Sequence, residues 1–515
     1  MEYIVVQAGG KGTRLKYLTK NKPKAMTPVY NLPMLFHLFR KYPDKKFVII
    51  ADYKKEVLRK YLEEFSEVKY LVVDASGIGT CAGVRQALGK IPDDEAFMLV
   101  WSDLILHDGF QLPKGYREGE TPDRDYIGLS ETFPCRWSFV DGILSEKKDT
   151  RCGVAGFFLF REKSVLKDVP ESGELVRWMK EKSFKFDTVG LAGTKEFGVL
   201  EEYKKLAVVK TRPFNRIIVH DGVLIKEPVD KQGEKLAVRE AKWYEKANEL
   251  KIGGIPEIYG TYPLRMELIK GKNIYECTFS YEERKEILRK LVNSLSELHE
   301  ATKVDADWFS MKEAYFKKTM QRLRKVENLV PYGRERFITV NSRRCRNVFY
   351  HRDELEKALE KLSCNSFSFI HGDCTFSNLM IRDNGDPVLI DPRGYFGFTE
   401  LYGDVRYDWA KLYYSLVGNY DKFNLKHFTL DIRRESVIDG KLIDELPEGD
   451  VRLSIESNGW EDLEKEFFEL TNTDKYEIKL LHAVIWLSLT TYAWQDYDSV
   501  CGAFYNGLYY LEEVL

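Results

Sequence analysis

The chain has 515 residues, of which 31% are charged and 44% hydrophobic, a composition typical of a globular protein with several domains. It carries 79 Lys and Arg against 81 Asp and Glu, and this formal charge of −2 argues against a general nucleic-acid binder. No apolar run approaches the roughly 18 residues that span a bilayer, so we expect no membrane insertion. Its eight cysteines form no C-x-x-C pair. We therefore expect neither a zinc site nor disulfides, and a cytoplasmic location.

The first part of the chain alternates short apolar runs with amphipathic stretches. Strands are predicted at residues 4–7, 47–51, 70–73, 97–101 and 153–160, and helices at 54–64, 82–88 and 201–206. This alternation is typical of an α/β layered domain with a largely parallel sheet.

A different pattern follows from about residue 208. A β-hairpin is predicted at 216–226, a helix at 236–250, a long amphipathic helix at 281–302, and short strands at 367–370 and 387–390. We predict domains at 1–207 and 208–515, the second with a small lobe to about residue 270 and a helical lobe beyond it. Residues 428–457 are predicted to be an insertion.

A glycine-rich segment follows the first strand and includes Ala8, Gly9, Gly10, Gly12, Thr13 and Arg14. Glycines let the backbone approach a ligand and point N–H groups at phosphate oxygens. Arg14 and the downstream Lys24 add cations that can bind those oxygens. The glycines alone fit a tight turn equally well, and their spacing is not the dinucleotide fingerprint.

Together, G-x-G-T-R-L at 10–15 and P-K-x-x-x-P-V at 23–29 resemble the nucleotidyltransferase superfamily, which joins a nucleoside triphosphate to a sugar or alcohol phosphate. The resemblance covers about residues 1–206 and implies a Rossmann-like mixed sheet of the GT-A type. It implies that Arg14 and Lys24 act catalytically on the triphosphate. It also implies the roles of five further residues: Gly79 and Thr80 near the base, Asp103 as a Mg²⁺ ligand, and Glu146 with Lys147 at the acceptor's phosphate.

The sequence departs from this family at one position. Its second metal-binding aspartate is expected just before the closing helix, where this chain has Gly198. Glu196 and Asp187 are the possible substitutes, and the sequence does not place either of them.

A second polar motif follows the strand at 367–370. It contains His371, Gly372 and Asp373, then Asn378, and Asp391 comes thirteen residues later at the end of the next strand. This spacing parallels that of protein kinases and can set a general base and two magnesium ligands around a γ-phosphate. For His371 we favour a structural role in the loop.

With these residues, the part from about 210 to 515 resembles the aminoglycoside phosphotransferase and choline kinase superfamily, which implies an α+β, protein-kinase-like fold. It implies that Asp373 accepts the substrate proton and that Asn378 and Asp391 hold Mg²⁺. It further implies an ATP site, formed by the ion pair Lys226–Glu240 and by a hinge with Glu267 and Leu268. Taken alone, the Lys–Glu pair fits a surface salt bridge as well. No glycine-rich loop precedes Lys226.

Two features of the sequence bear on which alcohol the kinase phosphorylates. A choline site needs an aromatic cage, and residues 486–510 are rich in Trp, Tyr and Phe, but aromatics at helical spacing are more typical of a core. Choline kinases tend to follow the metal aspartate with an acidic–aromatic pair, whereas this chain has Pro392, Arg393, Gly394 and Tyr395. Arg393 as a substrate-binding residue suits a sugar or an anionic metabolite. We favour a sugar or polyol, with an amino alcohol second.

The two resemblances together imply a bifunctional enzyme. The kinase makes a phosphomonoester with ATP, and the first domain activates it with a second nucleotide, CTP favoured, for surface polysaccharide or lipid synthesis. Mg²⁺ is expected at both sites, and the partners are small-molecule substrates. Three alternatives stay open: a choline kinase with a phosphocholine cytidylyltransferase, a single active kinase with a degenerate regulatory first domain, and an antibiotic-modifying kinase. Oligomeric state is not predicted.

Overall fold

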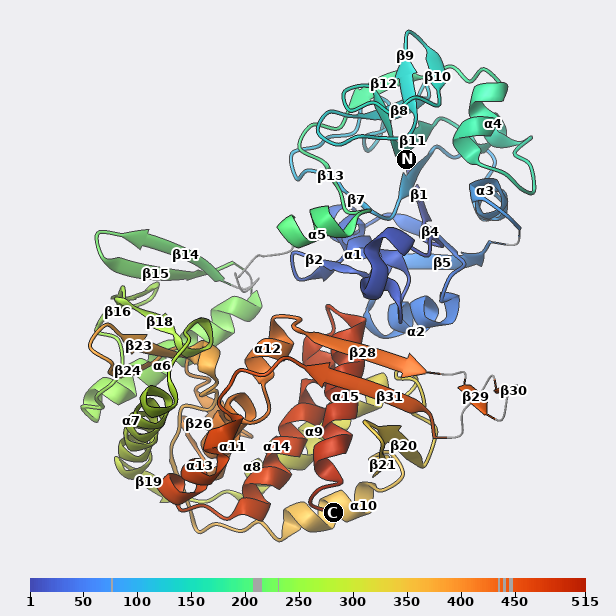
Figure 1. The fold of residues 1–515 in the computed structure, drawn as a ribbon. Coiled ribbons are helices and arrows are strands. Elements are labelled where there is room, and N and C mark those ends of the chain that lie inside the picture. The colour runs from blue at the N-terminus through green and yellow to red at the C-terminus, as the bar shows by residue number, and fades with distance from the viewer. Residues whose placement is uncertain (76, 207–214, 230, 434–435, 439–440, 444–447) are drawn as a thin grey trace. The chain divides into compact units, whose positions relative to one another are not determined.

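The structure is a computed structural model that describes residues 1–75, 77–206, 215–229, 231–433, 436–438, 441–443 and 448–515 (Figure 1). It divides into two compact units, which are described separately. Unit 1 comprises Met1–Val209 and Trp494–Asp498, and unit 2 comprises Lys210–Ala493 and Ser499–Leu515. The predicted boundary at 207/208 lies outside the described residues.

The main sheet of unit 1 has the strand order β10-β9-β11-β6-β1-β4-β5, with β8 and β12 joined to it through β11. Its strands are β1 (Tyr3–Gln7), β4 (Lys46–Ala51), β5 (Lys69–Asp74), β6 (Phe97–Trp101), β8 (Tyr126–Ser130), β9 (Ser138–Val140), β10 (Ile143–Ser145), β11 (Gly153–Phe160) and β12 (Asp187–Gly190). Strands β6, β1, β4 and β5 are parallel, as predicted. Strand β11 runs antiparallel to β6, β8 and β9, so the sheet is mixed.

Helices and short two-stranded ribbons complete unit 1. They are α1 (Met34–Lys41), α2 (Lys55–Phe65), α3 (Thr80–Leu88), α4 (Leu175–Glu181), α5 (Leu200–Leu206), β2 (Pro28–Val29), β3 (Leu32–Pro33), β7 (Leu104–Ile105) and β13 (Lys195–Glu196). Helix α2 shows why the amphipathic prediction succeeds, because Val57, Leu58, Tyr61 and Leu62 form one buried stripe. Strand β13 pairs with β7, and this ribbon carries one wall of the first site.

Unit 2 begins with a four-stranded sheet in the order β14-β15-β17-β16. It contains β14 (Asn215–His220), β15 (Val223–Pro228), β16 (Ile258–Thr261) and β17 (Leu264–Glu267), and helix α6 (Lys231–Glu249) follows β15. Asp221 and Gly222 both have positive φ, which the predicted tight hairpin between β14 and β15 requires. This lobe places Lys226 on a strand and Glu240 on the helix after it.

The larger lobe of unit 2 is mainly helical (Figure 1). Its helices are α7 (Tyr281–Glu300), α8 (Trp308–Lys312), α9 (Lys318–Val326), α10 (Arg352–Glu360), α11 (Val405–Leu416), α12 (Tyr420–Asn424), α13 (Glu464–Thr471), α14 (Lys475–Leu489) and α15 (Tyr497–Leu511). The long helix α7 begins with a capping box between Ser280 and Glu283. Trp486, Phe504 and Tyr505 are fully buried, so these aromatic residues belong to the core, as expected.

Small sheets present the catalytic loops of this lobe. They are built from β18 (Gly271–Asn273), β23 (Leu379–Arg382) and β24 (Pro387–Leu389), from β19 (Lys303–Asp305), β22 (Ser366–Phe369) and β27 (Tyr402–Gly403), and from β25 (Tyr395–Phe396) and β26 (Thr399–Glu400). The loop after β22 and the loop after β24 both reach the second site.

The predicted insertion joins an additional sheet with the order β21-β20-β31-β28. Its strands are β20 (Phe337–Val340), β21 (Arg343–Arg346), β28 (Phe428–Arg433) and β31 (Asp450–Ile455). Strands β29 (Ser436–Ile438) and β30 (Lys441–Ile443) pair antiparallel in a separate two-stranded sheet. Among the described residues, no helix is long and apolar enough to cross a membrane.

Candidate active sites

The glycine-rich loop of unit 1 packs directly on the stem of Lys24. Gly12 has φ +66°, and a Cβ atom on it would lie 3.0 Å from Lys24 Cβ. Gly9 is equally confined, since its Cβ would lie 2.8 Å from Asp52 Cβ, whereas a Cβ on Gly10 would meet nothing within 4 Å. The loop therefore needs small residues for close packing, and it brings the two predicted motifs together.

Around this loop, Ala8 is buried at the end of β1, while Thr13 and Arg14 are exposed in the turn that follows. Exposure of Arg14 leaves its guanidinium available to a polyphosphate.

Lys24 and Asp103 form an ion pair, and both side chains are largely buried. Burial acts to raise the pKa of Asp103, but the charge of Lys24 lowers it below its usual value overall. The pair neutralises two charges that would be costly to bury singly. A triphosphate with a divalent cation would engage the same two groups separately, the ammonium with oxygens and the carboxylate with the cation.

Glu196 is the second carboxylate of this site. It lies on β13 opposite Leu104, the residue after Asp103, and its Oε1 is 3.8 Å from a guanidinium nitrogen of Arg14. Burial, reinforced by the charge of Asp103, raises the pKa of Glu196 to about 7. Two adjacent carboxylates of this kind fit a hard divalent cation, which prefers oxygen ligands.

Gly198 makes room for that carboxylate. A Cβ on Gly198 would lie 2.2 Å from Glu196 Oε1, so a side chain at 198 and the observed Glu196 conformation exclude each other. Asp187 is not a candidate, because it lies on β12 and pairs with Arg124 at 2.8 Å. Of the two possible substitutes, the structure places Glu196 in the site.

The other residues predicted for unit 1 lie in two places. Gly79 has φ +91° and packs against Gly173, while the hydroxyl of Thr80 accepts a hydrogen bond from the Leu175 amide at 2.8 Å. This turn is therefore fastened to the segment before α4. Glu146 pairs with Arg136 and Arg177, and Lys147 beside it is exposed.

In unit 2, Lys226 is the centre of a buried ion cluster. Its ammonium lies 2.7 Å from a carboxylate oxygen of Glu240 and 2.8 Å from one of Asp391. Burial acts to lower the pKa of Lys226, but the two carboxylates raise it overall. Both Lys226 and Glu240 are less than a tenth exposed, so their pair is not a surface salt bridge.

The catalytic-loop residues predicted from the motif also come together. Asn378 donates from Nδ2 to Asp373 Oδ2 at 3.0 Å, and Lys411 lies 2.9 Å from Asp373 Oδ1. The Ile390 amide donates to the Asn378 carbonyl, which sets Asp391 beside Asn378. Asp391 has φ +55°, a conformation that few residues other than glycine adopt and that is common at functional sites.

Asp408 on α11 supports this loop, although no sequence motif points to it. Its carboxylate accepts hydrogen bonds from the amides of His371 and Gly372 at 2.8 and 2.6 Å, and it contacts His299 at 3.0 Å. His371 is fully buried, and burial lowers its pKa, so the structural role expected for it agrees with its surroundings. A lone aspartate on a mainly apolar helix offers no sequence signal for such a role.

The donor sets suit magnesium at both sites. Asn378 and Asp391 supply an amide and a carboxylate oxygen in unit 2, as Asp103 and Glu196 supply carboxylates in unit 1. Mg²⁺ is usually held by one or two such groups together with substrate phosphates. The described part of the chain has no group of three or more His, Cys, Asp or Glu that could hold a metal ion.

At the predicted hinge, the backbone amides of Glu267 and Leu268 both have partners within the protein. The amide of Glu267 donates to the Glu257 carbonyl at 2.8 Å and that of Leu268 donates to the Gly222 carbonyl at 3.0 Å. The side chain of Glu267 pairs with Arg382. Both backbone donors at this position are therefore engaged within the small lobe.

Arg393 stands next to the catalytic loop. Its amide donates to the His371 carbonyl at 2.9 Å, and its Cβ would lie 3.0 Å from a Cβ on Gly372, the residue before Asp373. Its guanidinium donates to the hydroxyls of Tyr395, at 3.0 Å, and Tyr407. Arg393 thus packs against the residues that precede Asp373, and its predicted role in substrate binding stays a prediction.

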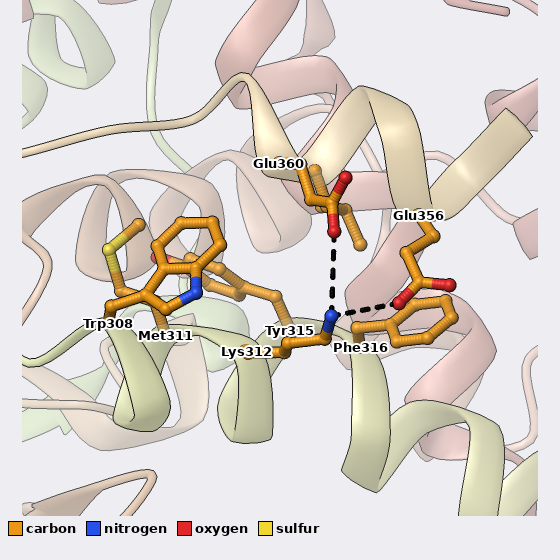
Figure 2. Close-up of a pocket in the computed structure, with 8 residues that line it drawn as sticks. Trp308, Met311, Lys312, Tyr315, Phe316, Glu356 and Glu360 are labelled. Carbon is orange, nitrogen blue, oxygen red and sulfur yellow. Dashed lines mark hydrogen bonds and ion pairs between the residues drawn. The ribbon is translucent and has the colours of Figure 1, made fainter. Parts of the chain in front are cut away.

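A separate hollow lies between α8 and α10 (Figure 2). It is walled by Trp308 and Phe316, and Lys312 lies between Glu356 and Glu360 at 3.0 and 3.4 Å. Its inner space of about 20 Å³ holds little more than one water molecule. It contains none of the catalytic residues described above.

The comparisons with known proteins follow the same division of the chain. Residues 3–114 match the nucleotidyl transferase family. Residues 235–425 match the phosphotransferase enzyme family. The predicted resemblance to these two families, in this order, is confirmed, and both matches support transferase activity.

Curated relatives match the first part. They include the UTP–glucose-1-phosphate uridylyltransferase AglF of Haloferax volcanii, 36% identical over 108 residues (20% of this chain, 44% of that protein). The mannose-1-phosphate guanylyltransferase of Mycobacterium tuberculosis is 33% identical over 187 residues (33% and 52%). The bifunctional protein GlmU of Methanocaldococcus jannaschii is 32% identical over 111 residues (21% and 26%). The chain thus spans about a quarter to a half of the length of these relatives.

Among solved structures, HddC from Yersinia pseudotuberculosis is similar with a TM-score of 0.34 and 22% identity, covering 40% of this chain and 98% of that one. The CTP:phosphocholine cytidylyltransferase from Streptococcus pneumoniae (LicC) has a TM-score of 0.32 and 18% identity, covering 40% and 97%.

Proposed function

We propose that the chain is a bifunctional transferase that acts twice on one metabolite. Unit 2 transfers the γ-phosphoryl group of ATP to a hydroxyl of a small molecule. Unit 1 then transfers a nucleotidyl group to the resulting phosphomonoester and releases pyrophosphate. The product is an activated donor of the kind used for surface polysaccharide or lipid synthesis.

One observation carries this proposal. In each unit, a lysine meets carboxylates from segments far apart in the sequence: Lys24 with Asp103 in unit 1, and Lys226 with Glu240 and Asp391 in unit 2. Catalysis of phosphoryl and nucleotidyl transfer needs cations and metal-binding oxygens that hold polyphosphate in line with an attacking oxygen.

In the first reaction, the acceptor hydroxyl attacks the γ-phosphorus of ATP, the bond to the β-phosphate oxygen breaks, and ADP leaves. Asp373 accepts the hydroxyl proton, and Asn378 holds the Asp373 carboxylate in place through its amide. Lys226 binds the α- and β-phosphates, with Glu240 fixing its ammonium. Mg²⁺ held by Asn378 and Asp391 would neutralise the charge between the phosphates.

In the second reaction, a phosphate oxygen of the product attacks the α-phosphorus of a nucleoside triphosphate, and pyrophosphate leaves. No protein nucleophile or base is needed, since a phosphomonoester is largely ionised near neutral pH. Arg14 and Lys24 bind the triphosphate, and the glycine-rich loop lets its backbone approach the phosphates. Asp103 and Glu196 would hold Mg²⁺, which supplies further charge neutralisation.

Glu196 supports an active first unit over a degenerate regulatory one. The missing aspartate at position 198 motivates the degenerate alternative, yet a second carboxylate lies beside Asp103. We propose CTP as the nucleotide. The names of the relatives include uridylyl, guanylyl and cytidylyl transfer, so they leave the base to be settled by assay with all four triphosphates.

A reciprocal pair of variants tests the proposal in the full chain. Asp373→Asn should lower ATP-dependent phosphorylation of a panel of polyols, amino alcohols and hydroxy acids by at least about 100-fold, because the proton acceptor is lost. It should leave pyrophosphate release from the corresponding phosphates and the four triphosphates unchanged.

Lys24→Ala should do the reverse, so each variant is the control for the other. If either substitution abolished both activities in a folded protein, two independent sites would be wrong. If the wild-type chain released no pyrophosphate with any phosphate and triphosphate, unit 1 would not be the transferase proposed.

A further inference from the structure

Positive side chains gather beside the catalytic loop of unit 2. Arg393 follows β24, Lys318 and Arg322 lie four residues apart on α9, and Lys411 lies on α11. Helices α9 and α11 both pack against α14. We name these residues the cationic cluster; its role depends on the kinase activity proposed for unit 2.

Tyrosines link the cationic cluster to Asp373. The Tyr395 hydroxyl accepts hydrogen bonds from Arg393 at 3.0 Å and from Lys318 at 3.1 Å. Tyr407 accepts another from Arg393, and its ring lies 6.0 Å from the ammonium of Lys411. Lys411 itself pairs with Asp373. A chain of contacts therefore connects Asp373, the proposed proton acceptor, to Lys318.

Carboxylates compensate only part of the positive charge of this cluster. Burial acts to lower the pKa of Arg393, but Tyr407, Tyr395 and Asp373 raise it overall. Among the described residues, Asp373 pairs with Lys411, but no carboxylate forms an ion pair with Arg393, Lys318 or Arg322. Burial, together with the charge of Arg393, lowers the pKa of Lys318 to about 8. Burial opposes ionisation of Tyr395, but Arg393 and Lys318 lower its pKa to about 7. The phenol thus partly supplies the negative charge that the site lacks.

A purely structural explanation covers only part of this arrangement. Arg393 stacks on the Tyr395 ring, 4.4 Å from its centroid, which is a stabilising contact by itself. Such a stack does not require Lys318 on the same hydroxyl. A second half-buried cation adds repulsion, which only partial ionisation of Tyr395 or a further anion would offset. Arg322 is different, because it donates to the Ser488 carbonyl and hydroxyl and thereby ties α9 to α14.

We propose that the acceptor phosphorylated by unit 2 is a small hydroxy compound with an anionic group, a carboxylate or a phosphate, which Arg393 and Lys318 bind while the hydroxyl meets Asp373. A guanidinium matches the two oxygens of either group, and a lysine adds a point charge. A quaternary ammonium or an amino alcohol would meet like charge there. The choline alternative is therefore disfavoured, and an acidic metabolite replaces the neutral sugar or polyol favoured from the sequence.

Four probes on one three-carbon skeleton test this inference in the full chain: glycerol, 3-amino-1,2-propanediol, glycerate and glycerol 3-phosphate. Binding is measured by calorimetry with ADP and Mg²⁺ present, and turnover by ADP release from ATP. We expect glycerate or glycerol 3-phosphate to bind at least tenfold more tightly than the neutral and cationic probes. The two anions distinguish a carboxylate site from a phosphate site.

Variants on one helix identify the residues. Lys318→Met should raise the dissociation constant or KM of the anionic probes, with a smaller effect on kcat, and so remove most of the preference for anions. Lys318→Arg should keep that preference. Arg324→Met is the matched control, because Arg324 is an exposed cation on the same helix, and it should change nothing.

The inference is overturned if the wild-type chain binds the neutral or cationic probe as well as the anions, if no probe binds, or if Lys318→Met and Arg324→Met behave alike. A different result would show that the proposed kinase activity is wrong. In that case ATP with Mg²⁺ would not bind, and Lys226→Met would have no effect on nucleotide binding. Anion preference without ATP binding would thus reject the kinase and keep the anion site.

Discussion

At the scale of single residues, the side chain of Glu196 limits which residue can stand at position 198. The carboxylate of Glu196 occupies the volume that a side chain on Gly198 would need, with only 2.2 Å to the ideal Cβ position. A side chain at 198 would therefore require the Glu196 carboxylate to move from its observed position. Glycine at 198 thus explains how a chain without the expected aspartate can keep two acidic groups in the site.

Substitutions can move the carboxylate from position 196 to position 198. Glu196→Ala should lower nucleotidyl transfer about 100-fold, a usual effect of losing a metal-binding contact. Gly198→Asp alone should also be impaired, because the new side chain collides with Glu196. The double variant Glu196→Ala/Gly198→Asp should recover much of the activity, as the carboxylate returns from the other position. Pyrophosphate release measures activity, and Mn²⁺ titration followed by water-proton relaxation reports metal binding independently. A double variant as poor as the worse single one would contradict the exchange.

His482 on α14 shows how a buried histidine makes stability depend on pH. Its Nε2 accepts a hydrogen bond from the Trp486 indole at 2.9 Å, and burial lowers its pKa to about 3. The neutral ring is therefore required in the folded state. Since the pKa in the unfolded chain is about 6.5, stability is fully present above that value and is lost as the pH falls from 6.5 toward 3.

Replacement by a neutral acceptor should remove this dependence. Between pH 7.5 and 5.5, we expect the wild type to lose about 1.4 kcal/mol of unfolding free energy through this residue. His482→Gln should lose correspondingly less, because its amide oxygen can still accept from Trp486 and does not titrate. Urea unfolding of both proteins at the two pH values measures the difference. Equal losses would show that His482 does not carry the effect.

At the scale of elements, the contact between β6 and β11 depends on one glycine. Gly156 has φ +78°, lies where the register between β11 and β8 shifts, and would place a Cβ 2.0 Å from the ring of Trp101. The indole therefore lies directly on the backbone of the neighbouring strand. An internal glycine in a strand indicates a bulge or a close approach to the backbone, but the sequence of β11 does not say which side chain approaches.

Gly156→Ala should consequently destabilise unit 1 by about 3 kcal/mol, from strained backbone and overpacking together. Gly142→Ala is the matched control. Gly142 also has a positive φ, +77°, but a Cβ there meets nothing within 4 Å, so it should cost only about 1 kcal/mol. Hydrogen exchange of β6 and β11 peptides across a urea series follows unit 1 separately from unit 2. Similar effects of the two substitutions would show that backbone strain, and not the Trp101 contact, dominates.

At the scale of the whole molecule, each unit contains the residues proposed for one of the two reactions. The cations and carboxylates of unit 1 all come from its own strands and loops, and those of unit 2 from its two lobes. The proposed reactions share an intermediate, since the phosphomonoester made by one unit is the nucleophile used by the other. An acidic acceptor would give that intermediate two anionic groups, and only one of them is the newly added phosphate.

Much of this could be predicted from the sequence because the relevant information is local. The hairpin at Asp221 and Gly222, the amphipathic helices and the parallel strands β1, β4, β5 and β6 follow from turn chemistry and hydrophobic period. The sequence could also predict that Asp373, Asn378 and Asp391 lie close together, because their spacing along a strand–loop–strand segment already limits their geometry. Strand direction was the exception, since a fully apolar strand such as β11 reads the same in either orientation.

Other features were decided only by the tertiary structure, because they depend on contacts between distant segments. The acidic partner of Asp103 is Glu196, and Asp408 holds the amides of the catalytic loop from another helix. Within unit 1, buried Lys22 is neutralised by Asp496, 2.9 Å away, and by Asp498. The charge around Asp373 likewise comes from a loop and two helices. Sequence order determined which chemical groups this protein has, whereas burial and long-range proximity determined which of them share a charge, a proton or a ligand.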